Sequence, residues 1–202
     1  MKKIAGISGL ASQLTIIGVL LVVVNKSPWF IWTQDFLSDF GYRGSMTGLY
    51  NWGLILTGVL SAVFVYGLRK NLTLNRTGLR GLTSLFTGSV AISVSGVLDK
   101  SMDIPHDISS SGSLILIITG MLLTGASLIH SPMLKLGFFS VTAGTIPIIL
   151  WLIPWQWPGD AIPQVFYFAA WSAWVFIFSM TLLRMPGTVP DEKSSLELSY
   201  TH

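Results

Sequence analysis

Two polar stretches contain the side chains with which this sequence could do chemistry. The first holds Ser38 and Asp39, and the second runs from Asp99 to His106. A carboxylate and an imidazole can act together as general acid and base, and both can also bind a divalent cation. We therefore predict Asp39 and His106 as candidate catalytic residues. Ser38, Asp99 and, shortly after the first stretch, Asn51 are the candidate ligand-binding residues.

Each of these residues also has a purely structural interpretation, which the sequence leaves open. Asp39 can cap a turn, Asp99 can end a helix at the membrane interface, and His106 can be solvated. The chain has no cysteine, which excludes disulfides and thiolate metal sites. It also lacks His-Glu-x-x-His, Gly-x-Ser-x-Gly and P-loop motifs, and we predict no cofactor and no resident metal.

The composition indicates the environment in which these residues must be positioned. The chain has 202 residues, of which 51% are hydrophobic and only 10% are charged, and its mean hydropathy is +0.66. A soluble domain contains about 25% charged residues, so most of this surface needs a cover of lipid. That excludes a soluble enzyme, a disordered chain and a nucleic-acid-binding module.

Six uncharged segments are long enough to cross a bilayer, which takes about 20 apolar residues. Each should be a helix, because backbone polar groups in lipid must be paired within the segment. We predict an all-α integral membrane bundle of six transmembrane helices over residues 1–184 and a polar cytoplasmic tail at 185–202. The predicted spans are residues 4–24, 48–68, 82–98, 113–129, 136–154 and 165–183.

The basic residues predict the orientation, because Lys and Arg collect in cytoplasmic loops. With the N-terminus inside, nine of the twelve Lys and Arg residues lie on the inner side. Both termini are then cytoplasmic, and both polar stretches lie at the outer face. The net charge of +3 is thus the difference between a basic inner face and an acidic outer face. We expect a multi-pass protein of the plasma membrane.

The third predicted span, 82–98, is rich in small residues. Ser84 and Gly88, and Ser89 and Ser93, are small-x-x-x-small pairs, which let helices approach closely. They predict a central position for this span. They also leave open contact with a partner helix or a second copy of the chain, in addition to membrane lipids. We expect no nucleic-acid partner.

The motif Ser-Asp-Phe-Gly at residues 38–41 and the positions after it resemble a known family. Asn51 opens a glycine-bearing span, and Gly96 precedes a loop that ends in His106. Over about residues 30–125, this pattern is similar to the domain-of-unknown-function 998 group, small six-helix membrane proteins of archaea and bacteria. The resemblance implies a prokaryotic membrane location and marks Asp39, Asn51 and His106. It brings no established activity.

Three functions are compatible with this sequence. The chain can bind or modify a lipid headgroup at the outer leaflet through its outward-facing Asp/Asn/His cluster. It can instead be a structural or assembly subunit without catalysis, or a small transporter or channel. Charge-free spans argue against a proton relay. The lipid-headgroup interpretation is our leading hypothesis, and whether the protein is an enzyme stays open.

Overall fold

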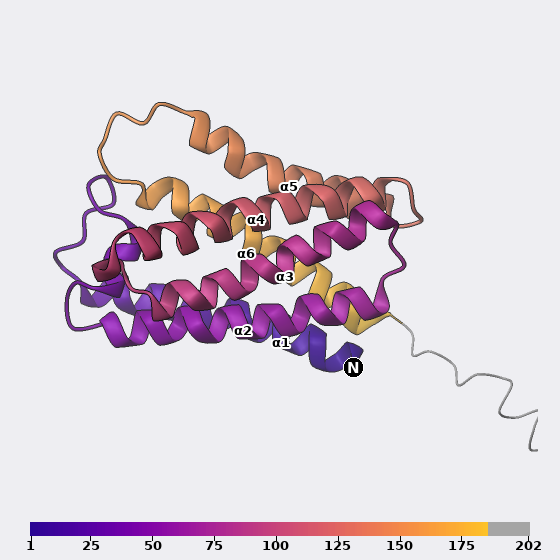
Figure 1. Cartoon of the computed structure of the whole chain (residues 1–202), viewed down its shortest axis with the longest axis horizontal. Coiled ribbons are helices and arrows are strands. Elements are labelled where there is room, and N and C mark those ends of the chain that lie inside the picture. The colour runs from indigo at the N-terminus through magenta and orange to yellow at the C-terminus, as the bar shows by residue number, and fades with distance from the viewer. Residues whose placement is uncertain (186–202) are drawn as a thin grey trace, which may run out of the picture.

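The computed structural model describes residues 1–185, which form a bundle of six long helices with two short 3₁₀ helices in its connections (Figure 1). The elements are α1 (Lys2–Lys26), η1 (Leu37–Gly41), α2 (Thr47–Asn71), α3 (Arg76–Val97), η2 (Lys100–Met102), α4 (Ile104–Ile129), α5 (Leu134–Leu152) and α6 (Ala161–Arg184). No strand occurs within these residues, so the predicted all-α class is confirmed. The tail predicted at 185–202 lies, from residue 186 onward, outside the described residues.

Five of the described helices are long and apolar enough to cross a membrane, namely α1, α2, α4, α5 and α6. The chain is therefore a multi-pass membrane protein. α3 falls short because it begins with Arg76 and Arg80 and carries glycines and small hydroxyl residues in place of large apolar ones. It nevertheless has 22 residues and packs along both α2 and α4.

Consecutive helices pack against each other, and α6 packs against both α5 and α1, so the bundle closes on itself. The N-terminus and the end of α6 lie together at one end of the bundle (Figure 1). The segments 27–46, 98–103 and 153–160 lie at the opposite end, which we call the loop end. This is the end that the sequence predicts to be the outer one, and it holds both polar stretches.

All six helices begin earlier than the apolar segments predicted from the sequence, and the difference is largest, six residues or more, for α3 and α4. α3 begins at Arg76 rather than at 82. At this earlier start, the Asn75 side chain accepts a hydrogen bond from the Gly78 amide at 3.0 Å and caps the first turn. α4 begins at Ile104 rather than at 113, with Pro105 in its first turn. Helical hydrogen bonding continues through polar residues that hydropathy places outside the membrane. His106 consequently lies on a helix and not in a loop.

The small residues of α3 are used within the chain, against α2 and α4. The Ser93 hydroxyl donates to the Ile55 carbonyl of α2 at 3.0 Å, and the Ser84 hydroxyl donates to the Leu116 carbonyl of α4 at 2.7 Å. A Cβ added to Gly58 of α2 would lie 2.5 Å from the carbonyl oxygen of Ser89. These backbones are therefore as close as glycine allows, but α3 is not central: like the other helices of the closed ring, it packs chiefly against its two neighbours.

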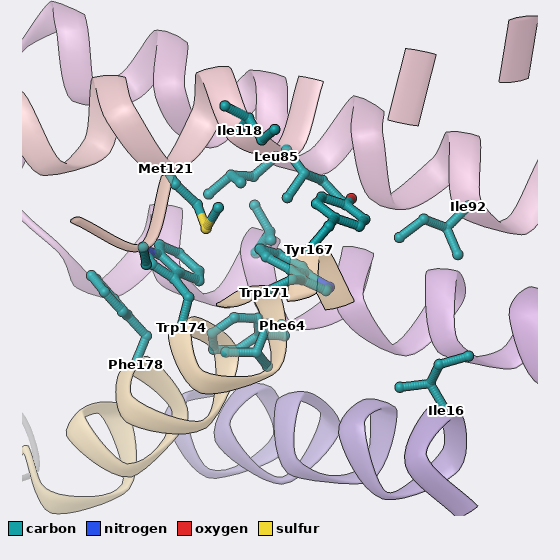
Figure 2. Close-up of a cluster of buried hydrophobic side chains, with 14 of the residues drawn as sticks. Ile16, Phe64, Leu85, Ile92, Ile118, Met121, Tyr167, Trp171, Trp174 and Phe178 are labelled. Carbon is teal, nitrogen blue, oxygen red and sulfur yellow. The ribbon is translucent and has the colours of Figure 1, made fainter. Parts of the chain in front are cut away.

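Large aromatic side chains of α6 fill the middle of the bundle (Figure 2). The rings of Trp171 and Trp174 stack at 5.5 Å, and those of Trp174 and Phe178 at 4.0 Å. The Trp174 indole N–H donates to the Ser140 hydroxyl at 2.6 Å, which in turn donates to the Met121 carbonyl at 2.7 Å. This chain of hydrogen bonds fixes α6 against α5 and α4.

The contact of α2 with α3 gives a direct test of this packing. Gly58→Ala should lower the free energy of unfolding by about 1–3 kcal/mol, because the new methyl group overlaps the α3 backbone. Gly48→Ala, on the same helix but with open space around its Cα, should be neutral or raise it by up to about 1 kcal/mol. Reversible unfolding in detergent micelles measures both. Equal stabilities of the two variants would contradict the close approach.

Candidate functional site

A small polar cavity of about 100 Å³ lies near the loop end of the bundle. Side chains from α2, α3, α4 and α6 form its walls, η1 contributes Leu37 and Ser38, and Trp151 of α5 borders it. These helices all begin or end close to the cavity, which places it within the first turns from the loop end. The polar lining of this polar cavity includes Ser38, Ser95, His106, Ser110, Ser113, Gln164 and Tyr167.

His106 is the candidate catalytic residue that lines the polar cavity. Its side chain is buried, and its Nδ1 lies 2.6 Å from the Leu98 carbonyl oxygen. A carbonyl can only accept a hydrogen bond, so Nδ1 carries a hydrogen and, in the neutral ring, Nε2 presents a lone pair. Nε2 is buried and has no hydrogen-bond partner within residues 1–185. His106 therefore brings to the lining of the cavity an acceptor that no described residue satisfies.

Tyr167 of α6 supplies a second polar group without a partner. Figure 2 shows its ring projecting from α6 into the interior of the bundle. Its hydroxyl lies near the Ser113 side chain, but no hydrogen bond of good geometry satisfies it within the described part of the chain. Tyr167 is not among the site residues predicted from the sequence, because a tyrosine in an apolar span is ordinarily a core residue. Gln164 lies three residues earlier on the same helix face, and its polar side chain could have marked this face of α6 as part of a polar site.

Three serine hydroxyls near the cavity donate hydrogen bonds to neighbouring protein groups. The Ser113 hydroxyl donates to the Ser110 carbonyl at 2.7 Å, and the Ser109 hydroxyl donates to the His106 carbonyl at 2.9 Å. Ser95 Oγ lies 3.0 Å from both the Ala91 carbonyl oxygen and Ser109 Oγ. Hydroxyl oxygens that have given up their hydrogens can only accept further bonds. Together with His106 Nε2, the oxygens of Ser95 and Ser113 add hydrogen-bond acceptors to a wall that also carries the donors of the Tyr167 hydroxyl and the Gln164 amide.

Asp39, the other candidate catalytic residue, is occupied by an ion pair. Its Oδ1 lies 2.5 Å from Nζ of Lys100, and its Oδ2 accepts a hydrogen bond from the Phe36 amide at 2.8 Å. The Lys100 ammonium also lies 4.1 Å from the centre of the Phe36 ring. The carboxylate is buried and its charge is balanced. This pair fastens η1, which covers the polar cavity, to η2.

Asn51 and Asp99 also make contacts within the loop end. The Asn51 side chain donates to the Gly41 carbonyl at 2.9 Å and so holds the end of η1 against α2. Asp99 accepts a hydrogen bond from the Ser101 amide at 2.9 Å and another from the Ser101 hydroxyl, which caps η2. Of the five predicted site residues, Ser38 and His106 thus line the polar cavity, and the other three hold the segments around it.

The arrangement suits binding of a polar group better than preformed nucleophilic catalysis. Because His106 Nε2 has no partner in the described residues, no serine of the cavity forms a ready Ser–His pair. Nε2 can accept a hydrogen bond or a proton from a bound group. No cluster of three or more His, Asp or Glu side chains suited to a metal ion occurs among residues 1–185.

The ion pair of the loop end can be tested by a double-mutant cycle. Asp39→Asn and Lys100→Met should each reduce the free energy of unfolding, since the first leaves the half-buried ammonium of Lys100 and the second the buried carboxylate of Asp39 without its partner. The coupling energy should be about 1–3 kcal/mol. The matched control is Asp35 with Arg43, a more exposed pair at 3.6 Å, for which about 0–1 kcal/mol is expected. Equal coupling in both cycles, measured by unfolding in micelles, would contradict the fastening role.

Comparison with known proteins identifies the family of the chain. No curated protein and no solved structure matches it. A family model described as a protein of unknown function, DUF998, matches residues 10–181. The match covers almost all of the helical bundle, including both polar stretches, and it confirms the resemblance that the sequence motifs indicate. The chain therefore belongs to the DUF998 family.

Proposed function

We propose that this protein binds the headgroup of a membrane lipid in the polar cavity, from the outer leaflet of the plasma membrane. One observation carries the proposal: His106 and Tyr167 both line the cavity, and each has a buried polar atom, Nε2 and the hydroxyl oxygen, without a hydrogen-bond partner within residues 1–185. A buried polar group without a partner costs about 1–3 kcal/mol. A ligand that satisfies both recovers that free energy.

The orientation of the bundle supports an outer-leaflet site. If α2 and α4 cross the bilayer, α3 crosses with them, because it packs beside both and connects their opposite ends. All six helices then span the membrane, and the N-terminus and the end of α6 lie on one side. Eight of the eleven Lys and Arg residues within 1–185 belong to that side, which makes it cytoplasmic. The loop end, with its polar cavity, faces outward.

The chemistry of the cavity wall indicates which headgroups would bind. The acceptors of the wall, His106 Nε2 among them, complement hydrogen-bond donors, and the lipid groups that carry donors are hydroxyls and primary ammonium groups. A single water needs about 10–15 Å³ of such space, so the polar cavity of about 100 Å³ admits several non-hydrogen atoms. The terminal part of a glycerol or ethanolamine headgroup fits this description. The quaternary ammonium of choline has no donor.

The predicted site residues then divide into two roles. Ser38 and His106 would contact the headgroup, together with Tyr167. Asp39 would be a positioning residue, as would Asn51, because each holds η1 in place over the cavity. Asp99 would position η2. On this proposal the protein is first of all a lipid-binding protein, and the Asp39 carboxylate does not touch the ligand.

Lipid binding by two cavity variants tests the proposal. The purified protein is titrated with phosphatidylglycerol, phosphatidylethanolamine or phosphatidylcholine in detergent, and bound lipid is counted by native mass spectrometry. The wild type should favour the first two lipids over phosphatidylcholine. Tyr167→Phe and His106→Ala should each weaken their binding about three- to tenfold, the equivalent of one lost hydrogen bond. A comparison of phosphatidylglycerol with phosphatidylethanolamine shows whether a hydroxyl or an ammonium group is the preferred donor.

The controls separate binding from folding. Tyr167→Phe removes a hydroxyl that has no partner among the described residues, so its stability should not fall. His130→Ala changes an exposed histidine at the opposite end of α4, and its lipid affinity should equal that of the wild type. Equal affinity for all three lipids, or wild-type binding by both cavity variants, would refute the headgroup site.

A further inference from the structure

The end of the bundle opposite the loop end, which we call the inner end, is strongly basic. It contains the N-terminus, the α2–α3 and α4–α5 connections and the end of α6. Its basic residues within 1–185 are Lys2, Lys3, Arg69, Lys70, Arg76, Arg80, Lys135 and Arg184. Every Asp and Glu of residues 1–185 lies instead at the loop end. The described part of the inner end therefore attracts anions.

An open crevice of about 110 Å³ lies between α2 and α3, in the half of the bundle nearest the inner end. It is lined by Val65, Tyr66 and Arg69 of α2 and by Leu82, Thr83 and Phe86 of α3. Val65 and Leu82 are buried and form its floor, whereas the other four are exposed along its rim. Because α2 is a membrane-spanning helix, the bilayer covers this rim, and lipid is the occupant within reach.

Two arginines lie at the same depth on either side of the mouth of this α2–α3 crevice. The hydrogen bond from Ser93 to the Ile55 carbonyl fixes the register of the two antiparallel helices. At 1.5 Å per residue, Arg69 is about 21 Å along α2 from Ile55, and Arg80 is about 20 Å along α3 from Ser93. Arg80 is also on the same helix face as Thr83 of the rim, three residues later.

Lys70 adds a third cation beside the crevice. Its ammonium lies 5.6 Å from the centre of the Tyr66 ring, which forms part of the rim. Within residues 1–185, none of Arg69, Lys70 and Arg80 forms an ion pair with a carboxylate. Three such cations at the mouth of an apolar crevice complement a phosphate that carries a hydrocarbon chain.

We infer that the α2–α3 crevice binds an anionic phospholipid of the cytoplasmic leaflet, with its phosphate between Arg69 and Arg80. Part of a hydrocarbon chain lies on the floor of the crevice, toward Phe86, which is about 9 Å deeper than Arg80 along α3. This site is separate from the polar cavity: it lies in the opposite leaflet and selects for negative charge rather than for hydrogen-bond donors. It does not depend on a ligand in the polar cavity.

Two lipids without headgroup donors test this site apart from the polar cavity. Phosphatidylmethanol is anionic and phosphatidylcholine is zwitterionic, and neither headgroup carries a hydrogen-bond donor. The full-length protein is titrated with each in detergent, and bound lipid is counted by native mass spectrometry. The wild type should bind phosphatidylmethanol at least fivefold more tightly. Arg69→Gln and Arg80→Gln should each weaken that binding about fivefold. Lys135→Gln removes the same charge from the inner end, outside the crevice, and should change it less than twofold.

A matched pair of larger side chains tests whether the crevice holds the hydrocarbon chain. Thr83→Trp fills the crevice from its exposed rim and should weaken phosphatidylmethanol binding at least threefold. Thr87→Trp, exposed one turn further along α3 and outside the crevice, should leave it unchanged. Glycerol 3-phosphate at the concentration of the lipid should not displace it, because this anion has no chain. All these variants change exposed side chains, so their unfolding temperatures should equal that of the wild type.

Three results would overturn the inference. Equal losses in Arg69→Gln and Lys135→Gln would mean that the whole inner end attracts anionic lipid diffusely. Equal affinities of Thr83→Trp and Thr87→Trp would mean that no chain enters the crevice, and displacement by glycerol 3-phosphate would indicate a site for a free phosphate. Tyr167→Phe and His106→Ala should leave phosphatidylmethanol binding unchanged, so failure of this site and failure of the headgroup site in the polar cavity are distinguishable.

Discussion

The close approach of α3 to α2 and α4 is the constraint on which the rest of the structure depends. Lipid chains are as apolar as leucine, so helices in a bilayer associate through tight packing and interhelical hydrogen bonds. Ser84 and Ser93 make such bonds to backbone carbonyls of both neighbours. The contact continues to the loop end, where Ser95 of α3 meets Ser109 of α4 at 3.0 Å. The register that brings Ser95 beside the first turns of α4 therefore also fixes where His106 lies.

The loop end is closed by polar links between segments that are distant in the sequence. The Asp39–Lys100 ion pair joins η1 to η2, and the Gly159 amide donates to the Thr33 carbonyl at 3.1 Å, which joins segment 153–160 to segment 27–46. Gly159 is required there, because a Cβ would lie 2.5 Å from the carbonyl carbon of Gln34. These links hold the segments of the loop end, and with them η1, in place over the polar cavity.

Much of the fold can be predicted from this sequence, and less of the candidate site. Apolar runs predict the helices because lipid allows few other structures, although α3 has too few large apolar residues to qualify by hydropathy alone. Ser38 and His106 line the polar cavity. Their predicted companions, Asp39, Asn51 and Asp99, bind neighbouring groups instead, since a sequence does not reveal which partner a buried carboxylate meets. Tyr167 went unnoticed because composition cannot distinguish a packed hydroxyl from an unpartnered one.

Several buried polar groups of the described chain have no partner, yet they differ in what they imply. The hydroxyls of Thr57 and Ser61 lie on α2 and can turn toward the carbonyl one helical turn earlier, so a rotamer change satisfies them. The imidazole of His106 has no such freedom. Its orientation is fixed by the bond from Nδ1 to the Leu98 carbonyl, and that same bond directs the lone pair of Nε2 away from the backbone. Nε2 is therefore the polar atom of the cavity lining on which the proposed headgroup site depends most directly.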